Sequence, residues 1–137
     1  MKKFFTGILG IVVVSGILYA ANRAEAKDNA YKAAVVLTVA GYNLKGMKGE
    51  YLSTNGYRTY TSYLYSSNKY VVVGAGDNSV RDLDVQIYDR NWNLIASDND
   101  SSSVSVAEFY PPHSGTYYIR TKMYSGSGYF FQMVGWK

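Results

Sequence analysis

The chain has 137 residues, with 14 Lys and Arg against 10 Asp and Glu, and it contains no cysteine. The lack of cysteine excludes disulfide bonds, thiol redox chemistry and a lipid anchor on an N-terminal cysteine. Half of the formal net charge of +4 lies in the first 26 residues. The charge that remains gives no support for nucleic-acid binding, which usually needs a clustered basic face.

The first 26 residues have the order of a secretory signal. Lys2 and Lys3 precede a mostly apolar stretch from 4 to 21, and the small-residue triplet 24–26, Ala-Glu-Ala, follows it. A basic start, an apolar middle and an A-x-A site predict export with cleavage after Ala26. The alternative is an uncleaved membrane anchor, because about 18 residues of low polarity can span the hydrocarbon core. We therefore expect an extracytoplasmic protein, periplasmic or secreted, with no membrane contact once the signal is cleaved.

Residues 27–42 are predicted to form a short helix that packs on a sheet. Asp28 is placed as its N-cap, and Gly41 lies just past its end. Its apolar stripe is broad enough to need a partner surface. The alternatives are a linker and a strand built on the β-branched residues of 35–39. The residues that recur at helical spacing are Ala30, Ala33, Ala34 and Leu37.

Residues 43–137 are predicted to form one all-β domain, a sandwich or barrel. After Gly41 the sequence consists of short alternating runs separated by turn signals such as Ser-Thr-Asn-Gly at 53–56. Short strands at this spacing are typical of a sandwich or barrel. The eight candidate strands are 48–52, 57–65, 69–76, 82–88, 93–97, 103–110, 116–124 and 128–134.

Alternation within these strands predicts which side chains point inward. The inward residues are expected to be Leu83, Val85 and Ile87 in 82–88, Tyr117, Ile119 and Met123 in 116–124, Tyr129, Phe131 and Met133 in 128–134, and Tyr60 and Leu64 in 57–65. Strand 57–65 would then point Tyr57, Tyr63 and Tyr65 outward. That assignment depends on the register, since a slip of one residue inverts the faces.

Four segments in order resemble the bacterial pre-peptidase C-terminal domain. They are DLDVQIYD at 82–89, NWNLIAS at 91–97, FYPPHSGTYYIR at 109–120 and SGSGY at 125–129, and the resemblance covers about residues 57–134. It implies a jelly-roll-like β-sandwich, usually carried as an accessory module of secreted proteases and other exported enzymes. No enzyme accompanies it here, so the chain looks like a stand-alone relative. Trp92 stands where the family commonly has a glycine.

An outward face of aromatic and cationic residues is the first candidate binding site. Tyr and Arg together are over-represented at binding surfaces. We expect a polysaccharide, a cell-wall polymer or an extended polypeptide as its ligand. The alternative is that these residues fill strand positions and keep a sheet face soluble. The face comprises Tyr118, Arg120, Lys122 and Tyr124, together with Trp92, Tyr63 and Tyr65.

A group of acidic residues is the second candidate site. Carboxylates at alternate strand positions point the same way and can share a hard cation, so calcium is the candidate ion. The alternative is that Asp and Asn serve as ordinary turn residues. The candidate ligands are Asp77, Asp82, Asp84, Asp98 and Asp100.

The sequence contains no catalytic constellation that predicts an enzyme. There is no cysteine nucleophile and no G-x-S-x-G motif, and the single histidine, His113, lies in a Pro-Pro-His-Ser-Gly turn. We therefore expect an exported, non-catalytic binding or accessory module. One alternative is a partner or inhibitor of a separately encoded secreted peptidase. The other is a metal-dependent hydrolase that uses the acidic group.

Overall fold

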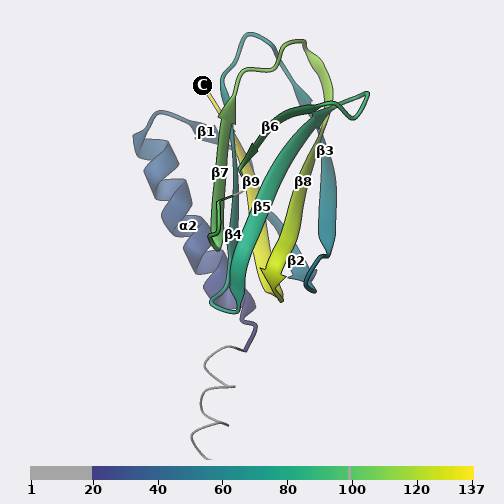
Figure 1. The fold of residues 1–137 in the computed structure, drawn as a ribbon. Coiled ribbons are helices and arrows are strands. Elements are labelled where there is room, and N and C mark those ends of the chain that lie inside the picture. The colour runs from purple at the N-terminus through teal and green to yellow at the C-terminus, as the bar shows by residue number, and fades with distance from the viewer. Residues whose placement is uncertain (1–19, 99) are drawn as a thin grey trace, which may run out of the picture.

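The computed structural model describes residues 20–98 and 100–137, and most of the predicted signal lies outside this part of the chain. All eight predicted strands are confirmed to within a few residues. A further two-residue strand, β1, was not predicted. The elements, labelled in Figure 1, are α2 (Arg23–Val39), β1 (Asn43–Leu44), β2 (Lys48–Leu52), β3 (Tyr57–Leu64), β4 (Tyr70–Gly76), β5 (Val80–Asp89), β6 (Leu94–Asp98), β7 (Val104–Phe109), β8 (Gly115–Gly126) and β9 (Gly128–Trp136).

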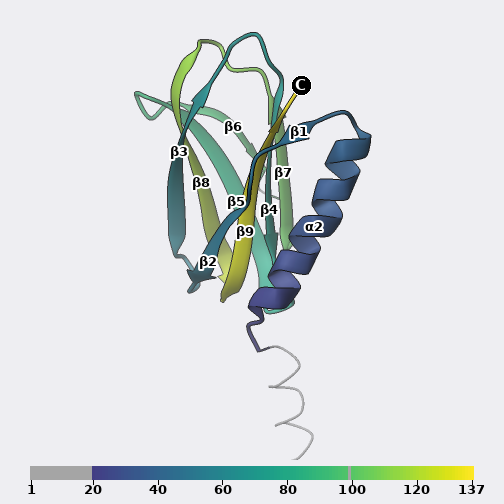
Figure 2. The same ribbon diagram turned by 180° about the vertical axis from the view of Figure 1, so that it is seen from behind.

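The strands form two antiparallel sheets that face each other, which confirms the predicted β-sandwich. One sheet has five strands in the order β1-β9-β4-β7, and β2 also pairs with β9. The other has four strands in the order β3-β8-β5-β6. Helix α2 lies along the outer side of the five-stranded sheet, against β4 and β9 (Figure 1, Figure 2). The sandwich therefore has one sheet covered by a helix and one whose outer face carries no helix of the described chain.

The core between the sheets contains the residues that alternation placed inward. Leu83, Val85 and Ile87 of β5 have no exposed surface, and Ile119 and Met123 of β8 are equally buried. Burial of such side chains removes apolar surface from water and is the main favourable term in folding. The predicted inward faces of β5 and β8 are therefore confirmed.

A second apolar layer lies between α2 and the five-stranded sheet, and it reverses the predicted faces of β9. Phe131 and Met133 pack under the helix, whereas Phe130 and Val134 point toward the other sheet. The prediction that Tyr129, Phe131 and Met133 face the sandwich core was wrong. A strand covered on both faces is apolar on both, so alternation does not identify its inner side.

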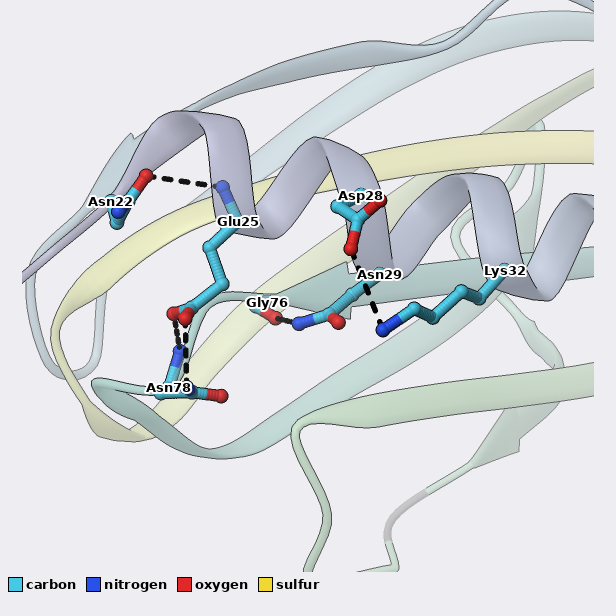
Figure 3. Close-up of polar contacts among 7 residues, drawn as sticks. All are labelled: Asn22, Glu25, Asp28, Asn29, Lys32, Gly76 and Asn78. Atoms are coloured by element: carbon cyan, nitrogen blue, oxygen red, sulfur yellow. Dashed lines mark hydrogen bonds and ion pairs between the residues drawn. The ribbon is translucent and has the colours of Figure 1, made fainter.

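Helix α2 begins at Arg23, four residues before the predicted range, and Asp28 is not its N-cap. The cap is Asn22, whose Oδ1 accepts a hydrogen bond from the Glu25 amide at 3.1 Å. Asp28 lies inside the helix and pairs with Lys32 at 3.4 Å (Figure 3). The predicted end is confirmed, because Gly41 has a φ of +95° just past the helix, where glycine is favoured.

The first turn of α2 is attached to the end of β4. The Glu25 carboxylate accepts hydrogen bonds from the backbone and side-chain amides of Asn78, both at 2.7 Å, and the Asn29 amide donates to the Gly76 carbonyl at 2.9 Å (Figure 3). Ala26 is fully buried. Cleavage after Ala26, as the signal pattern predicts, would remove part of this packed turn. Within residues 20–98 and 100–137, no helix is both long and apolar enough to cross a membrane.

Candidate functional site

The outer face of the four-stranded sheet carries the predicted aromatic and cationic residues. Three adjacent strands of this sheet, β3, β8 and β5, align their outward side chains in rows that run across the strands. One row contains Thr59, Arg120 and Gln86, and the next contains Thr61, Tyr118 and Tyr88. The register of β8 between β3 and β5 thus places Arg120 and Tyr118 in the middle of the face.

Arg120 lies at the centre of a group of aromatic rings. Its guanidinium carbon is 4.3 Å from the ring centroid of Tyr57, 5.2 Å from that of Tyr88 and 5.5 Å from that of Trp92. The Arg120 Nε donates to the Thr59 hydroxyl at 3.3 Å. A guanidinium over ring faces is attracted by their negative quadrupole, which orients the arginine. We call Tyr57, Tyr88, Trp92, Tyr118 and Arg120 the aromatic–arginine cluster.

Trp92 is held in the cluster by an unusual backbone. It lies in the turn between β5 and β6 with a φ of +63°, a left-handed conformation that costs a non-glycine residue about 1 kcal/mol. Its indole stacks on Tyr118 with a centroid distance of 4.2 Å and an interplanar angle of 9°. The side chain is nevertheless 49% exposed. A large aromatic residue is therefore kept partly open to solvent where glycine would be less strained.

The turn that presents Trp92 is organised by Asp89. The Asp89 carboxylate accepts the backbone amides of Asn91 at 2.8 Å and Asn93 at 2.9 Å, and the Asn93 side-chain amide at 3.1 Å. Hydrogen bonds from Asn93 are the main reason that the pKa of Asp89 lies below its usual range. This turn fixes the position of Trp92 before any ligand binds.

A pocket with buried carboxylates lies on the same face, toward the start of β5. Asp82 and Asp84 of β5 line it with Lys122 and Tyr124 of β8, and its volume is about 450 Å³. Asp84 is only 6% exposed, and the Oδ1 atoms of Asp82 and Asp84 are buried without a hydrogen-bond partner. Burial, and then the charge of Asp82, raise the pKa of Asp84 to about 6. We call Asp82, Asp84, Lys122 and Tyr124 the acidic pocket.

The structure divides the predicted binding residues between these two places. Tyr118, Arg120 and Trp92 meet in the aromatic–arginine cluster, whereas Lys122 and Tyr124 line the acidic pocket. Tyr63 and Tyr65 form a separate edge-to-face pair at 5.1 Å. Tyr57 and Tyr88 were not predicted to belong to the site. Both were expected on outward faces, but only the strand register shows that they adjoin Arg120.

The five predicted metal ligands do not form one site. Asp77 follows β4, and its carboxylate accepts the backbone amides of Asn22 at 2.7 Å and Tyr129 at 3.0 Å. Both Asp98 oxygens accept backbone amides, those of Asp100 and Val106. In the part of the chain that the structure describes, no three acidic or histidine side chains form a group that could hold a metal. Of the five, Asp82 and Asp84 both line the acidic pocket, and calcium binding stays a prediction.

The comparisons with known proteins agree with this architecture. The sequence matches no protein-family model, and it shows no significant similarity to the curated proteins. Among solved structures, the pre-peptidase C-terminal domain of a Bacillus anthracis collagenase is similar, with a TM-score of 0.54 and 16% identity over 65% of this chain and 87% of that one. The chain has a pre-peptidase C-terminal-like fold.

A second similar structure has the same degree of likeness. PliG from Aeromonas hydrophila, a periplasmic inhibitor of g-type lysozyme, gives a TM-score of 0.54 and 12% identity over 72% of this chain and 90% of that one. Identities this low establish the fold alone. The fold therefore does not say what the aromatic–arginine cluster binds, and that question depends on the chemistry of the cluster's own residues.

Proposed function

We propose that the chain is an exported, non-catalytic binding module that engages a protein partner through the aromatic–arginine cluster. The observation that carries the proposal is Trp92, which is half exposed on a strained backbone and stacked on Tyr118 beside Arg120. Strained residues persist only where the surrounding structure holds them, and they concentrate at functional sites.

The composition and the rigidity of the cluster both suit protein recognition. Trp, Tyr and Arg are the residues that most often dominate interface energies. Because Arg120 is already fixed by three rings and by Thr59, little side-chain entropy remains to be lost on binding. A preformed group of this kind favours binding without rearrangement.

The similar structures support a protein as the partner and an extracytoplasmic location. PliG is a periplasmic inhibitor of g-type lysozyme, so a protein with a similar fold acts on a protein target. The predicted export signal agrees with such a setting. A partner that is a secreted hydrolase, a lysozyme or a peptidase, is therefore favoured over a polysaccharide or cell-wall polymer.

Glu50 and Glu108, the carboxylates that a glycosidase pair would need, are better explained as parts of the framework. Glu50 on β2 pairs with Arg58 at 2.7 Å and accepts the Tyr60 hydroxyl, while Glu108 on β7 contacts Tyr42 and Lys69. Strands β9 and β4 lie between β2 and β7, so these carboxylates belong to strands separated by the width of two others in the sheet. This arrangement supports a module without catalytic activity.

The test measures binding of the purified exported protein to g-type lysozyme, secreted peptidases, insoluble peptidoglycan and a polysaccharide array. A double variant, Trp92→Ala with Arg120→Ala, is expected to weaken binding to its protein partner about tenfold or more. The matched control is Tyr31→Ala with Lys32→Ala, which removes an exposed aromatic and a cation from α2 and should change nothing.

Three results would count against the proposal. Binding to polysaccharide or peptidoglycan alone would contradict a protein partner. Full affinity in the Trp92→Ala, Arg120→Ala variant would contradict the site. No binding to any member of the panel would leave the cluster without its proposed role.

A further inference from the structure

The acidic pocket lies beside the aromatic–arginine cluster on the same sheet face. In the register of β5 with β8, Asp84 pairs with Lys122 and Gln86 pairs with Arg120, so the two sites are two residues apart along the strands. Two residues of strand span about 7 Å. A single partner that covers Arg120 would therefore also reach the pocket.

The pocket has an excess of negative charge that the described protein does not neutralise. Asp82, Asp84 and the neighbouring Asp98 face one ammonium group, that of Lys122. Lys122 lies over the Tyr124 ring at 5.7 Å, and among the described residues neither Asp82 nor Asp84 forms an ion pair within 4 Å. A buried carboxylate oxygen without a hydrogen bond is costly, and Lys122 is the cation that faces the pair.

Two observations together indicate a ligand at this place. Asp84 is more than nine-tenths buried and lines the pocket, and the Oδ1 atoms of Asp84 and Asp82 have no partner. Solvent does not compensate these two oxygens, because they are shielded from it. The side chains of Asp82 and Asp84 nevertheless line the pocket, so their charge can attract a cationic group that enters it.

We propose that the acidic pocket binds an arginine side chain of the partner protein. This assignment rests on the proposed function, since it names the chemistry of the partner. A guanidinium presents several N–H donors in one plane and can pair with two adjacent carboxylates, while its flat faces suit the exposed ring of Tyr124. A divalent cation fits less well, because it would meet two carboxylates beside the Lys122 ammonium. Both oxygens of the neighbouring Asp98 already accept backbone amides, and among the described residues no three acidic or histidine side chains form a metal-binding group.

The experiment uses N-acetyl-arginine amide as a probe of the exported protein at pH 7.5, with the backbone amide NMR signals of residues 82–86 as the readout. N-acetyl-citrulline amide is the neutral control of the same shape. We expect a saturable shift with the arginine probe and binding of the citrulline probe that is weaker by about tenfold or more. Asp84→Asn should reduce arginine binding by a similar factor, and Asp82→Asn is a second variant.

Asp28→Asn is the matched control, because it removes an exposed carboxylate from α2, which packs on the other sheet, and should leave the titration unchanged. Equal binding of both probes, or unchanged binding in both Asp82→Asn and Asp84→Asn, would overturn the proposal. Calcium chloride shifting the same signals without any effect of the arginine probe would replace it with a metal site.

Two variants distinguish a failure of the pocket assignment from a failure of the cluster assignment. Trp92→Ala should weaken partner binding but leave the arginine titration intact, whereas Asp84→Asn should weaken both. If the arginine probe does not bind while Trp92→Ala still weakens partner binding, the pocket assignment alone fails. If the probe binds but Trp92→Ala has no effect on the partner, the cluster assignment fails.

Discussion

The two sheets of this sandwich differ in what covers their outer faces. Every residue of β4 is buried, because the sandwich core lies on one side of it and α2 on the other. Strand β8 of the other sheet alternates between buried apolar residues and partly exposed polar or aromatic ones. The five-stranded sheet, which we call the covered sheet because α2 packs on it, thus carries apolar residues on both faces. The outer face of the four-stranded sheet, which we call the bare face, is free for contact with another molecule.

The bare face also contains features that cost stability. Trp92 has a left-handed backbone, and Asp82 and Asp84 have buried oxygens without partners. Residues at the covered sheet have well-matched contacts, such as the buried Ala26 and the Glu25–Asn78 hydrogen bonds. Departures from local rules are expected where function requires them. The contrast therefore supports a structural role for the helix side and a binding role for the bare face.

The largest expected effect comes from a matched pair of substitutions, one on each side. Phe131→Ala removes a buried ring under α2 and should lower the free energy of unfolding by about 3–4 kcal/mol. Tyr124→Ala removes an exposed ring from the bare face and should change it by less than about 0.5 kcal/mol. Urea unfolding measures both values. Similar losses of unfolding free energy in the two variants would contradict the difference between the covered sheet and the bare face.

Removal of the first turn of α2 should give the next largest effect. A chain that begins at Lys27 lacks the Asn22 cap, the Glu25–Asn78 hydrogen bonds and the buried Ala26. Compared with a chain that begins at Ala20, its free energy of unfolding should be lower by about 2–3 kcal/mol. Equal urea midpoints for the two chains would show that these contacts contribute nothing.

Asp84→Asn should stabilise the protein at neutral pH, with an effect that depends on pH. The folded pKa of about 6 exceeds the unfolded value of about 3.9, so stability of the parent protein falls as the pH rises from about 4 to 6. The groups that face Asp84 are Asp82, Asp98 and Lys122. We expect the variant to be more stable by about 1–2 kcal/mol at pH 7 and by nothing below about pH 4.

The measurement is a set of urea unfolding curves for parent and variant between about pH 3 and 7.5, a range that extends beyond both pKa values. A difference in stability that is constant with pH would contradict the raised pKa. A variant that is less stable than the parent at pH 7 would show that the Asp84 carboxylate has partners that stabilise it.

Trp92→Gly should have the smallest effect on stability. Glycine relieves the left-handed backbone by about 1 kcal/mol, and loss of the stacking on Tyr118 costs about as much. The thermal midpoint should therefore stay nearly the same while partner affinity falls. A large drop in the midpoint would indicate that Trp92 is mainly a packing residue.

Much of the fold could be predicted because alternation is reliable where one face meets water. Leu83, Val85 and Ile87 were assigned inward on that basis, and so were Ile119 and Met123. The same rule failed for β9, whose outer face is covered by α2. The start of α2 was missed because the small residues at 24–26 fit two patterns. They have the form of a signal cleavage site, and Ala26 also continues the helical stripe one turn before Ala30.

The candidate site could be predicted in part. Tyr118 and Arg120 were recognised as outward neighbours on one strand, and Trp92 as an exposed residue in a turn. The contacts of Arg120 with Tyr57 and Tyr88 depend on the register of three strands, which a single sequence does not specify. The left-handed backbone of Trp92 was not predicted. One signal for it was present, because Trp92 stands where the domains that the sequence resembles commonly have a glycine.

The most direct test of the binding role of the bare face is hydrogen exchange of the exported protein, free and in complex with the protein that it binds. Protection on binding is expected in β8, in the turn from Asp89 to Asn93 and in the outward part of β5. Protection centred on α2, with the β8 amides unchanged, would contradict the assignment of the aromatic–arginine cluster as the binding surface.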